Sequence, residues 1–202
     1  MIAALILAGG AAGRRGETLA LRPFPEVPLV AVQWLALRTA GLDPLRIAVG
    51  RGVAEIARGS GLARENFVGA PSSSPGALLR RGLGALLEAD EWDAVVVQPV
   101  EALPPHPAVV VALVERVVAG GLLAAVPAHR GRVGYPVVLA RDVAVELARP
   151  GSRGAGLAGA LRRLEEAGAS ERVEVYTGDV LRDLAEPATW RRAVREARKG
   201  AG

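Results

Sequence analysis

The sequence predicts an α/β protein, a three-layer α/β/α sandwich around a mainly parallel sheet. The first observation is the N-terminal run 2–8, which is apolar without alternation and ends at Gly9 and Gly10. Such a run is typical of a strand covered on both faces, as in a parallel sheet. The second is that short apolar runs alternate along the chain with segments of helical periodicity, the order of elements in a layered α/β domain.

Each strand is predicted from a short apolar run bounded by turn residues. The last of them, 172–176, alternates polar and apolar residues and is therefore expected at a half-exposed sheet edge. The expected strands cover residues 2–8, 45–49, 66–68, 93–97, 122–126, 135–139 and 172–176.

The helices are predicted from periodicity and from their start and stop signals. Gly41 ends the first, the Pro/Ser/Gly-rich loop 70–76 precedes the third, and Pro187 is a usual first-turn residue for the last. The expected helices cover 28–40, 53–58, 77–89, 107–118, 142–148, 156–167 and a C-terminal segment from about 187. We find no internal repeat and no long linker, so residues 1–202 are expected to form a single domain.

Composition restricts the function classes. The chain is 50% hydrophobic and 23% charged with only 3% aromatic residues, which indicates a globular core of Ala, Val and Leu. The absence of cysteine excludes disulfides and thiolate metal sites and fits a cytoplasmic location. We expect no export signal before the first strand, and no apolar stretch approaches the roughly 20 residues of a membrane helix, so no membrane partner is expected.

The net charge of +4 raises the question of nucleic acid. Arginines are spread along the chain and cluster only near the C-terminus, without the interleaved aromatics that stack bases. We interpret the cluster as a solvated helix face and expect no nucleic-acid partner. It comprises Arg191, Arg192, Arg195, Arg198 and Lys199. The three tryptophans, at 34, 92 and 190, are expected to pack in the core or at its edge.

The loop 9–16, GGAAGRRG, is the first candidate site. Its glycines let backbone amides approach an anion closely, and Arg14 and Arg15 add permanent positive charge, which indicates a triphosphate site. An ordinary glycine-rich turn remains an alternative. A Walker loop is excluded, because it needs a lysine in the loop and the only lysine is Lys199. The glycine spacing departs from the dinucleotide fingerprint, although Arg51 leaves an NADP-type fold open.

Residues 7–16, LAGGAAGRRG, resemble the L-A-G-G-x-S-x-R-M-G signature of the MobA-like nucleotidyltransferases, which include molybdenum cofactor guanylyl- and cytidylyltransferases. The resemblance implies a nucleotide-binding role for the matching residues, which are Leu7, Ala8, Gly9, Gly10, Arg14 and Gly16. It also implies that Arg14 stabilises the leaving pyrophosphate, and that 135–139 is an antiparallel strand. Ala12 and Arg15 depart from the signature. The family's following lysine is Leu19 here, and Arg22 is a candidate substitute.

A second candidate follows the strand 93–97, where Glu101 stands just past the carboxyl end. Open α/β sheets bind their ligands at this edge, and Mg²⁺ in nucleotidyl transfer is held by one or two carboxylates. Glu101 resembles the aspartate of the family at this place and is assigned a catalytic and metal-binding role. A plain loop glutamate remains the alternative.

Two further segments resemble family motifs incompletely. Gly134, Tyr135 and Pro136 correspond to a Gly-His-Pro segment that lines the acceptor pocket, with tyrosine in place of histidine. Residues 183–187, DLAEP, resemble the closing D-x-D-T-P, with Ala185 in place of the second aspartate. The two histidines, at 106 and 129, have no cysteine or helical partner, so a zinc site is not expected.

The resemblance implies a Rossmann-like nucleotidyltransferase fold and transfer of a nucleoside monophosphate from an NTP, CTP or GTP. The acceptor would be a small phosphate-bearing molecule such as molybdopterin, with release of pyrophosphate and Mg²⁺ as cofactor. The acceptor's own oxygen would be the nucleophile, so no covalent enzyme intermediate is needed. The alternative is a nucleotide- or cofactor-binding protein that has lost turnover, which the departures at Ala12, Leu19, Tyr135 and Ala185 favour.

Overall fold

The computed structural model describes residues 1–9, 18–89, 91–150 and 156–200. Its strands are β1 (Ile2–Ala8), β2 (Leu45–Val49), β3 (Phe67–Gly69), β4 (Ala94–Pro99), β5 (Ala124–His129), β6 (Arg132–Val133), β7 (Val137–Ala140) and β8 (Ser170–Glu174). Its α-helices are α1 (Leu29–Thr39), α2 (Val53–Ser60), α3 (Pro75–Ala89), α4 (Pro107–Val118), α5 (Arg141–Ala148), α6 (Gly156–Glu166) and α7 (Pro187–Gly200). Short 3₁₀ helices are η1 (Leu19–Leu21), η2 (Arg64–Asn66) and η3 (Gly178–Leu181).

One sheet holds all the described strands, in the order β3-β2-β1-β4-β7-β5-β6, with β8 paired to β5 at the edge. Strands β1 to β4 are mutually parallel, and β7 runs antiparallel to both β4 and β5. The mainly parallel sheet and its antiparallel strand are therefore confirmed. Strand β6 was not predicted; it pairs antiparallel with β5 across a turn at Arg130 and Gly131, both with positive φ.

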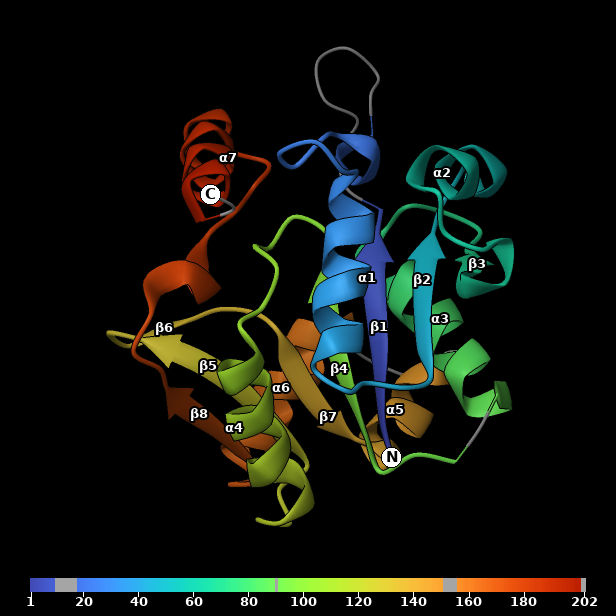
Figure 1. Cartoon of the computed structure of the whole chain (residues 1–202). Helices are drawn as coiled ribbons and strands as arrows, with labels where there is room; N and C mark the ends of the chain where they lie inside the picture. The colour runs from blue at the N-terminus through green and yellow to red at the C-terminus, as the bar shows by residue number, and fades with distance from the viewer. Residues whose placement is uncertain (10–17, 90, 151–155, 201–202) are drawn as a thin grey trace.

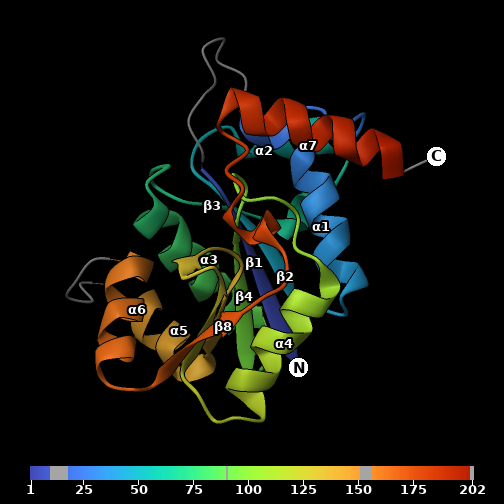
Figure 2. The same cartoon turned by 90° about the vertical axis from the view of Figure 1, so that its left-hand side faces the viewer.

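Helices cover both faces of the sheet and complete the three layers (Figures 1 and 2). Alternate side chains of β1 enter two separate cores. Ala4 and Ile6 pack with α1, α4 and α7, whereas Leu5 and Leu7 pack with α3 and α5. Because both faces are covered, the central strands are almost wholly apolar, which explains the unbroken run that predicts β1.

The edge formed by the carboxyl ends of β1, β2 and β4 carries the candidate site. Strand β7 runs in the opposite direction, so its first residues lie at this same edge. The register pairs Val97 of β4 with Val137 of β7, so the segment before β7 lies opposite the segment after β4. The topology thus brings the regions around residues 9, 101 and 135 together.

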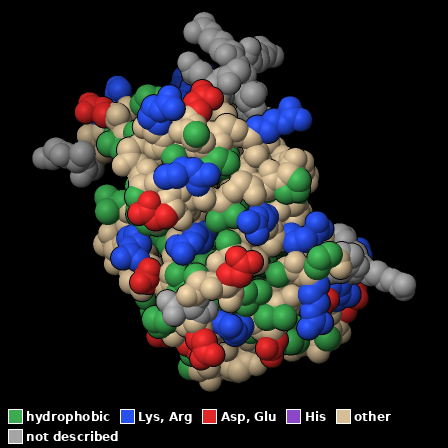
Figure 3. Space-filling model, turned by 90° about the vertical axis from the view of Figure 1, so that its right-hand side faces the viewer, with side chains coloured by type: hydrophobic (Ala, Val, Ile, Leu, Met, Phe, Trp, Pro, Cys, Tyr) green, Lys and Arg blue, Asp and Glu red, His purple; other side chains and the backbone are tan. Residues whose placement is uncertain are grey.

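The C-terminal helix α7 packs its apolar side against the first core. Trp190 is buried and meets the Phe24 ring edge-on, with ring centroids 5.5 Å apart. Trp92 is also buried and Trp34 packs against the first core, so the packing role predicted for the tryptophans is confirmed. The basic side chains of α7 are exposed, as predicted. On the face that Figure 3 shows, basic side chains are interspersed with acidic and hydrophobic ones.

Within the described part of the chain, no helix combines the length and apolar character needed to cross a bilayer.

Candidate functional site

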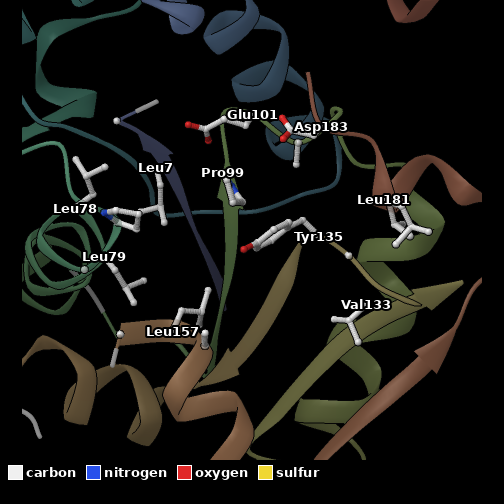
Figure 4. Close-up of a pocket in the computed structure, with 18 of the residues that line it drawn as sticks. Leu7, Leu78, Leu79, Pro99, Glu101, Val133, Tyr135, Leu157, Leu181 and Asp183 are labelled. Atoms are coloured by element: carbon white, nitrogen blue, oxygen red, sulfur yellow. The ribbon is translucent and has the colours of Figure 1, made fainter. Parts of the chain in front are cut away.

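A pocket of about 780 Å³ opens at the carboxyl edge of the sheet (Figure 4). Its volume lies in the range of small-molecule sites, about 300–1,000 Å³. Leu7 and Gly9 line it from the end of β1, and Leu78 and Leu79 from α3. The remaining walls come from the loop before α3, the segment after β4, β6 with the residues between it and β7, the start of α6, and the segment from η3 to residue 183.

Gly9 is required at the end of β1 because the loop before α3 approaches it closely. A Cβ built on Gly9 would lie 2.0 Å from Leu78 Cδ1 and 2.8 Å from the carbonyl oxygen of Ser73. Gly50, after β2, meets the same loop, since a Cβ there would lie 2.2 Å from Ser73 Oγ. The glycines therefore allow the serine loop 72–74 to fold over the strand ends and form one rim of the pocket.

Glu101 and Asp183 are the two acidic side chains among the described residues that line the pocket. They come from segments far apart in the sequence, which meet in an antiparallel bridge between Ala102 and Asp183. The backbone N–H of Leu184 also donates a 2.6 Å hydrogen bond to the carbonyl of Glu101. Figure 4 shows the two side chains at the same side of the opening.

The environment of Glu101 disfavours its charge. Burial raises the pKa of the Glu101 carboxyl above its ordinary value, and the carboxylate of Asp183 raises it further by like-charge repulsion. Two carboxylates that repel each other at the mouth of a pocket can be stabilised together by a cation between them. Their oxygens are hard donors, the type that Mg²⁺ and Mn²⁺ prefer.

Tyr135 enters the pocket from the start of β7, with its hydroxyl pointing into the opening (Figure 4). Its backbone N–H donates to Val180 O over 3.0 Å. The preceding Gly134 is needed for this contact, because a Cβ there would lie 2.1 Å from the same oxygen. Burial raises the pKa of the Tyr135 hydroxyl, and the charge of Glu101 raises it further, so the hydroxyl remains a hydrogen-bond donor at neutral pH.

Two arginines, Arg132 and Arg182, also line the pocket, and they differ in their surroundings. Arg182 is mostly buried and forms ion pairs with Asp179, over 2.9 Å, and with Glu196 of α7. Its hydrogen bond lowers the pKa of Glu196. Arg132 of β6 is exposed and has no ion pair with any described acidic residue. Of the two arginines, Arg132 therefore carries the positive charge that neighbouring carboxylates neutralise less.

The sequence-predicted site residues fall into three groups. Those that line the pocket are Leu7, Gly9, Glu101, Gly134 and Tyr135. Ala8 and Pro136 are buried beside it and do not line it. Gly10, Arg14 and Gly16 lie outside the described residues.

Sequence reasoning did not assign a role to Asp183, Arg132 or Arg182. Asp183 had one signal, its place in the DLAEP segment, which resembles the closing D-x-D-T-P but has Ala185 in place of the second aspartate. The two arginines had no signal that distinguished them from the other arginines of the chain.

The residues near the family's lysine position have packing roles. Leu19 is buried in the first core. The Arg22 guanidinium lies over the Trp190 ring, 4.1 Å from its centroid, and Arg22 is not among the residues that line the pocket. Neither therefore presents a cation to the pocket in this structure.

The histidines have structural partners. His106 caps α4 by accepting from the Ala108 N–H over 3.2 Å, and His129 Nδ1 lies 2.9 Å from Val175 O. Among the described residues no group of three or more His, Cys, Asp or Glu side chains is placed to hold a metal.

Comparisons with known proteins show the family and the fold of the chain. A family model described as the MobA-like NTP transferase domain matches residues 4–171. No curated protein sequence matches the chain. A solved nucleotidyl transferase from Methanothermobacter thermautotroptrophicus is similar over 99% of both chains, with 19% identity and a TM-score of 0.77.

Two more solved proteins share the fold. Rv0371c from Mycobacterium tuberculosis has 23% identity over 96% of this chain and 97% of that one, with a TM-score of 0.73. A second structure of Rv0371c is a complex with manganese, with 22% identity, 96% and 98% coverage and a TM-score of 0.66. CMP:2-keto-3-deoxy-manno-octonic acid synthetase, solved with CTP, has 16% identity, 98% and 99% coverage and a TM-score of 0.69.

Proposed function

Because this chain belongs to the MobA-like NTP transferase domain family, we propose that it transfers a nucleoside monophosphate from CTP or GTP to a small phosphate-bearing acceptor such as molybdopterin. An acceptor phosphate oxygen attacks the α-phosphorus, and the bond from that phosphorus to the bridging oxygen breaks as pyrophosphate leaves. The observation that carries this proposal is the convergence of Glu101 and Asp183 on the pocket that Gly9 and Tyr135 also line.

The nucleotide is assigned to the side of the pocket nearest β1. Gly9 and the loop that follows it would bring backbone amides to the phosphates, and Arg14, from the sequence pattern, would stabilise charge on the departing pyrophosphate. The serine loop 72–74 forms the adjacent rim through its contact with Gly9. This arrangement follows the general rule that open α/β sheets bind ligands outside the carboxyl ends of their strands.

The residues present fit a divalent cation. Glu101 and Asp183 would hold it, with phosphate oxygens and water completing the ligands, as is usual for Mg²⁺. When bound, such a cation neutralises charge on the triphosphate and on the leaving group. Asp183 thereby takes a role that the sequence alone left to the missing aspartate at Ala185. The manganese complex of Rv0371c supports a divalent metal in this fold, and Mg²⁺ is our proposal for this chain.

The acceptor is assigned to the wall formed by Gly134, Tyr135 and β6. Tyr135 replaces a histidine of the family motif and cannot exchange a proton near neutral pH, since its pKa is raised. Its hydroxyl would orient the acceptor by donating a hydrogen bond. The nucleophile is a phosphate oxygen that is already ionised at neutral pH, so this step needs no general base.

A second candidate is a nucleotide-binding protein without turnover. The observation that favours it is the burial of Leu19 where the family has a lysine, because this position cannot supply a cation to the phosphates. The two candidates share the pocket and differ only in chemistry.

The test is pyrophosphate release by the purified chain with CTP or GTP, Mg²⁺ and molybdopterin or a related phosphate-bearing acceptor. We expect release that requires the acceptor and is lost in Glu101→Ala. Nucleotide binding without release, with every acceptor tried, would instead support the binding protein.

A further inference from the structure

Two buried glutamines lie beneath the loop that carries Glu101. Gln33 comes from α1 and Gln98 from β4, and both side chains are fully buried. Apart from them, Ser60 is the one buried polar or charged residue in the described chain. A carboxamide is seldom placed among apolar side chains unless its hydrogen bonds are needed there.

Both amide groups donate to the backbone of the segment 99–103. Gln33 Nε2 lies 2.7 Å from Ala102 O, 3.1 Å from Val100 O and 3.4 Å from Pro99 O. Gln98 Nε2 lies 3.1 Å from Leu103 O and 3.4 Å from Ala102 O. All these partners are carbonyl oxygens, which can only accept, so the nitrogen end of each amide must face the loop.

Together with Leu184, the glutamines engage every backbone carbonyl from 99 to 103. Leu184 N–H takes the remaining carbonyl, that of Glu101. The N–H groups of Val100 and Ala102 are also used, toward Leu7 O and Pro99 O. The short loop is thus fixed to β1, to α1 and to the segment after η3, and the Glu101 side chain is aimed from a backbone with little freedom.

The oxygen end of each amide, in contrast, is buried without a partner in the described chain. Neither Gln33 Oε1 nor Gln98 Oε1 has a hydrogen-bond partner among the described residues, although both atoms are buried. An unpaired buried acceptor is destabilising, and an apolar side chain of similar size at either position would avoid it. The two glutamines are therefore poorly explained by core packing alone, and well explained by the carbonyls that they hold.

We infer that Gln33 and Gln98 are positioning residues, which hold Glu101 beside Asp183 in the geometry required to share one divalent cation. The presence of a cation at Glu101 and Asp183 rests on the proposed function, whereas the hydrogen bonds that fix the loop do not depend on it. Partners that orient a metal ligand commonly change metal affinity by about 10–100-fold when they are removed.

The test uses the full chain and the variants Gln33→Met and Gln98→Met, alone and combined, because methionine keeps the length and removes the donors. Ser60→Ala is the matched control, since it removes a buried hydroxyl that donates to Ala57 O and accepts from the Leu62 N–H, neither of which belongs to the segment 99–103. Two quantities are measured: the affinity for Mn²⁺ in the presence of CTP or GTP, and hydrogen exchange of the Leu184, Val100 and Ala102 amides.

We expect each single variant to weaken Mn²⁺ binding by about tenfold or more, and to accelerate exchange at Leu184, Val100 and Ala102 but not at amides in the centre of β1. Ser60→Ala should change neither quantity. Unchanged Mn²⁺ affinity in both single variants, or acceleration spread equally over the whole chain, would overturn the inference. Where the combined variant does not fold, the single variants decide.

The design separates failure of the inference from failure of the proposed function. A wild-type chain that binds no Mn²⁺ with either nucleotide contradicts the proposed metal site, and local exchange at Leu184 then decides whether the glutamines fix the loop. Local acceleration in the variants supports that role, and unchanged exchange overturns it.

Discussion

Leu184 donates its backbone N–H to the carbonyl of Glu101 over 2.6 Å, which places the neighbouring Asp183 carboxylate at the same pocket as Glu101. The chain thereby brings together two carboxylates whose charges repel. Because like charges held close together lower the stability of the folded chain, a protein that only needed to fold would gain from separating these carboxylates.

Replacing Glu101 by Gln should stabilise the protein at neutral pH. Because the pKa of Glu101 is raised in the folded chain above its ordinary 4.5, the native state binds this proton more tightly than the unfolded state. The stability that Glu101 contributes is therefore present below pH 4.5 and is lost as the pH rises through the raised pKa of the folded chain. The variant has no such loss.

Urea denaturation at pH 7 and below pH 4.5 measures this effect. The free energies of unfolding of wild type and variant should converge at the lower pH, with the variant more stable at pH 7. Glu115→Gln, on the exposed side of α4, is the control and should show no such difference. A Glu101→Gln chain that is less stable than wild type at pH 7 contradicts the account.

Gly9→Ala should weaken both the fold and nucleotide binding. The added methyl group would overlap Leu78 and the Ser73 carbonyl, and overpacking of this kind costs about 1–3 kcal/mol. Gly84→Ala in α3 is the matched control, because nothing lies within 4 Å of its Cβ position. Since alanine is the better helix former, the control should gain about 1 kcal/mol. Equal effects of the two substitutions on the unfolding free energy would refute the close packing at Gly9.

Arg132→Ala should raise the KM for the acceptor while leaving nucleotide affinity near that of wild type. Arg132 is part of the wall that we assign to the acceptor, and a hydrogen bond to a charged phosphate contributes about 1.5–3 kcal/mol, roughly ten- to a hundredfold in KM. Arg130→Ala, in the adjacent turn and outside the pocket, is the control. Steady-state kinetics with varied acceptor measure the effect. An increase confined to the nucleotide KM would place Arg132 in a different role.

Arg14→Ala should diminish the thermal stabilisation that CTP or GTP provides, whereas Arg22→Ala and Arg192→Ala should not. A ligand at a hundredfold excess over its Kd stabilises by about 2.7 kcal/mol. Arg22 stacks on Trp190, and a cation–π contact of this kind contributes about 0.5–1 kcal/mol to the free energy of unfolding. Its loss should therefore lower the melting temperature measured without ligand. A nucleotide effect lost in Arg22→Ala but kept in Arg14→Ala would instead assign the phosphate contact to Arg22.

The sequence predicts the sheet more completely than it predicts the site. Strand β1 and the end of β2 are given by unbroken apolar runs, and α4 has the predicted bounds because Pro107 marks its first turn. Strand β6 was missed because it is short and exposed on both faces, so it has no apolar alternation to detect. It still contributes Arg132 and Val133 to the pocket.

Glu101 was singled out because it follows an apolar strand at the edge where ligands bind, and Tyr135 because residues 134–136 resemble the family's Gly-His-Pro segment; both line the pocket. Asp183 was not singled out, because its position depends on the bridge to Ala102, a contact that no local pattern encodes. Gln33 and Gln98 had a weak signal, a polar residue within an otherwise apolar helix face and at the end of an apolar strand. Only the folded chain shows that both amides reach the same loop.

The most direct test of the carboxylate pair is the affinity for CTP and GTP, measured by calorimetry with Mg²⁺ and with a chelator. We predict that Mg²⁺ tightens nucleotide binding to the wild-type chain, that Glu101→Ala and Asp183→Asn each abolish this dependence, and that Glu101→Asp retains it. Glu115→Ala, remote from the pocket, should behave as wild type. Equal affinity with and without Mg²⁺, unchanged in Glu101→Ala, would contradict the proposed transferase and leave a nucleotide-binding protein.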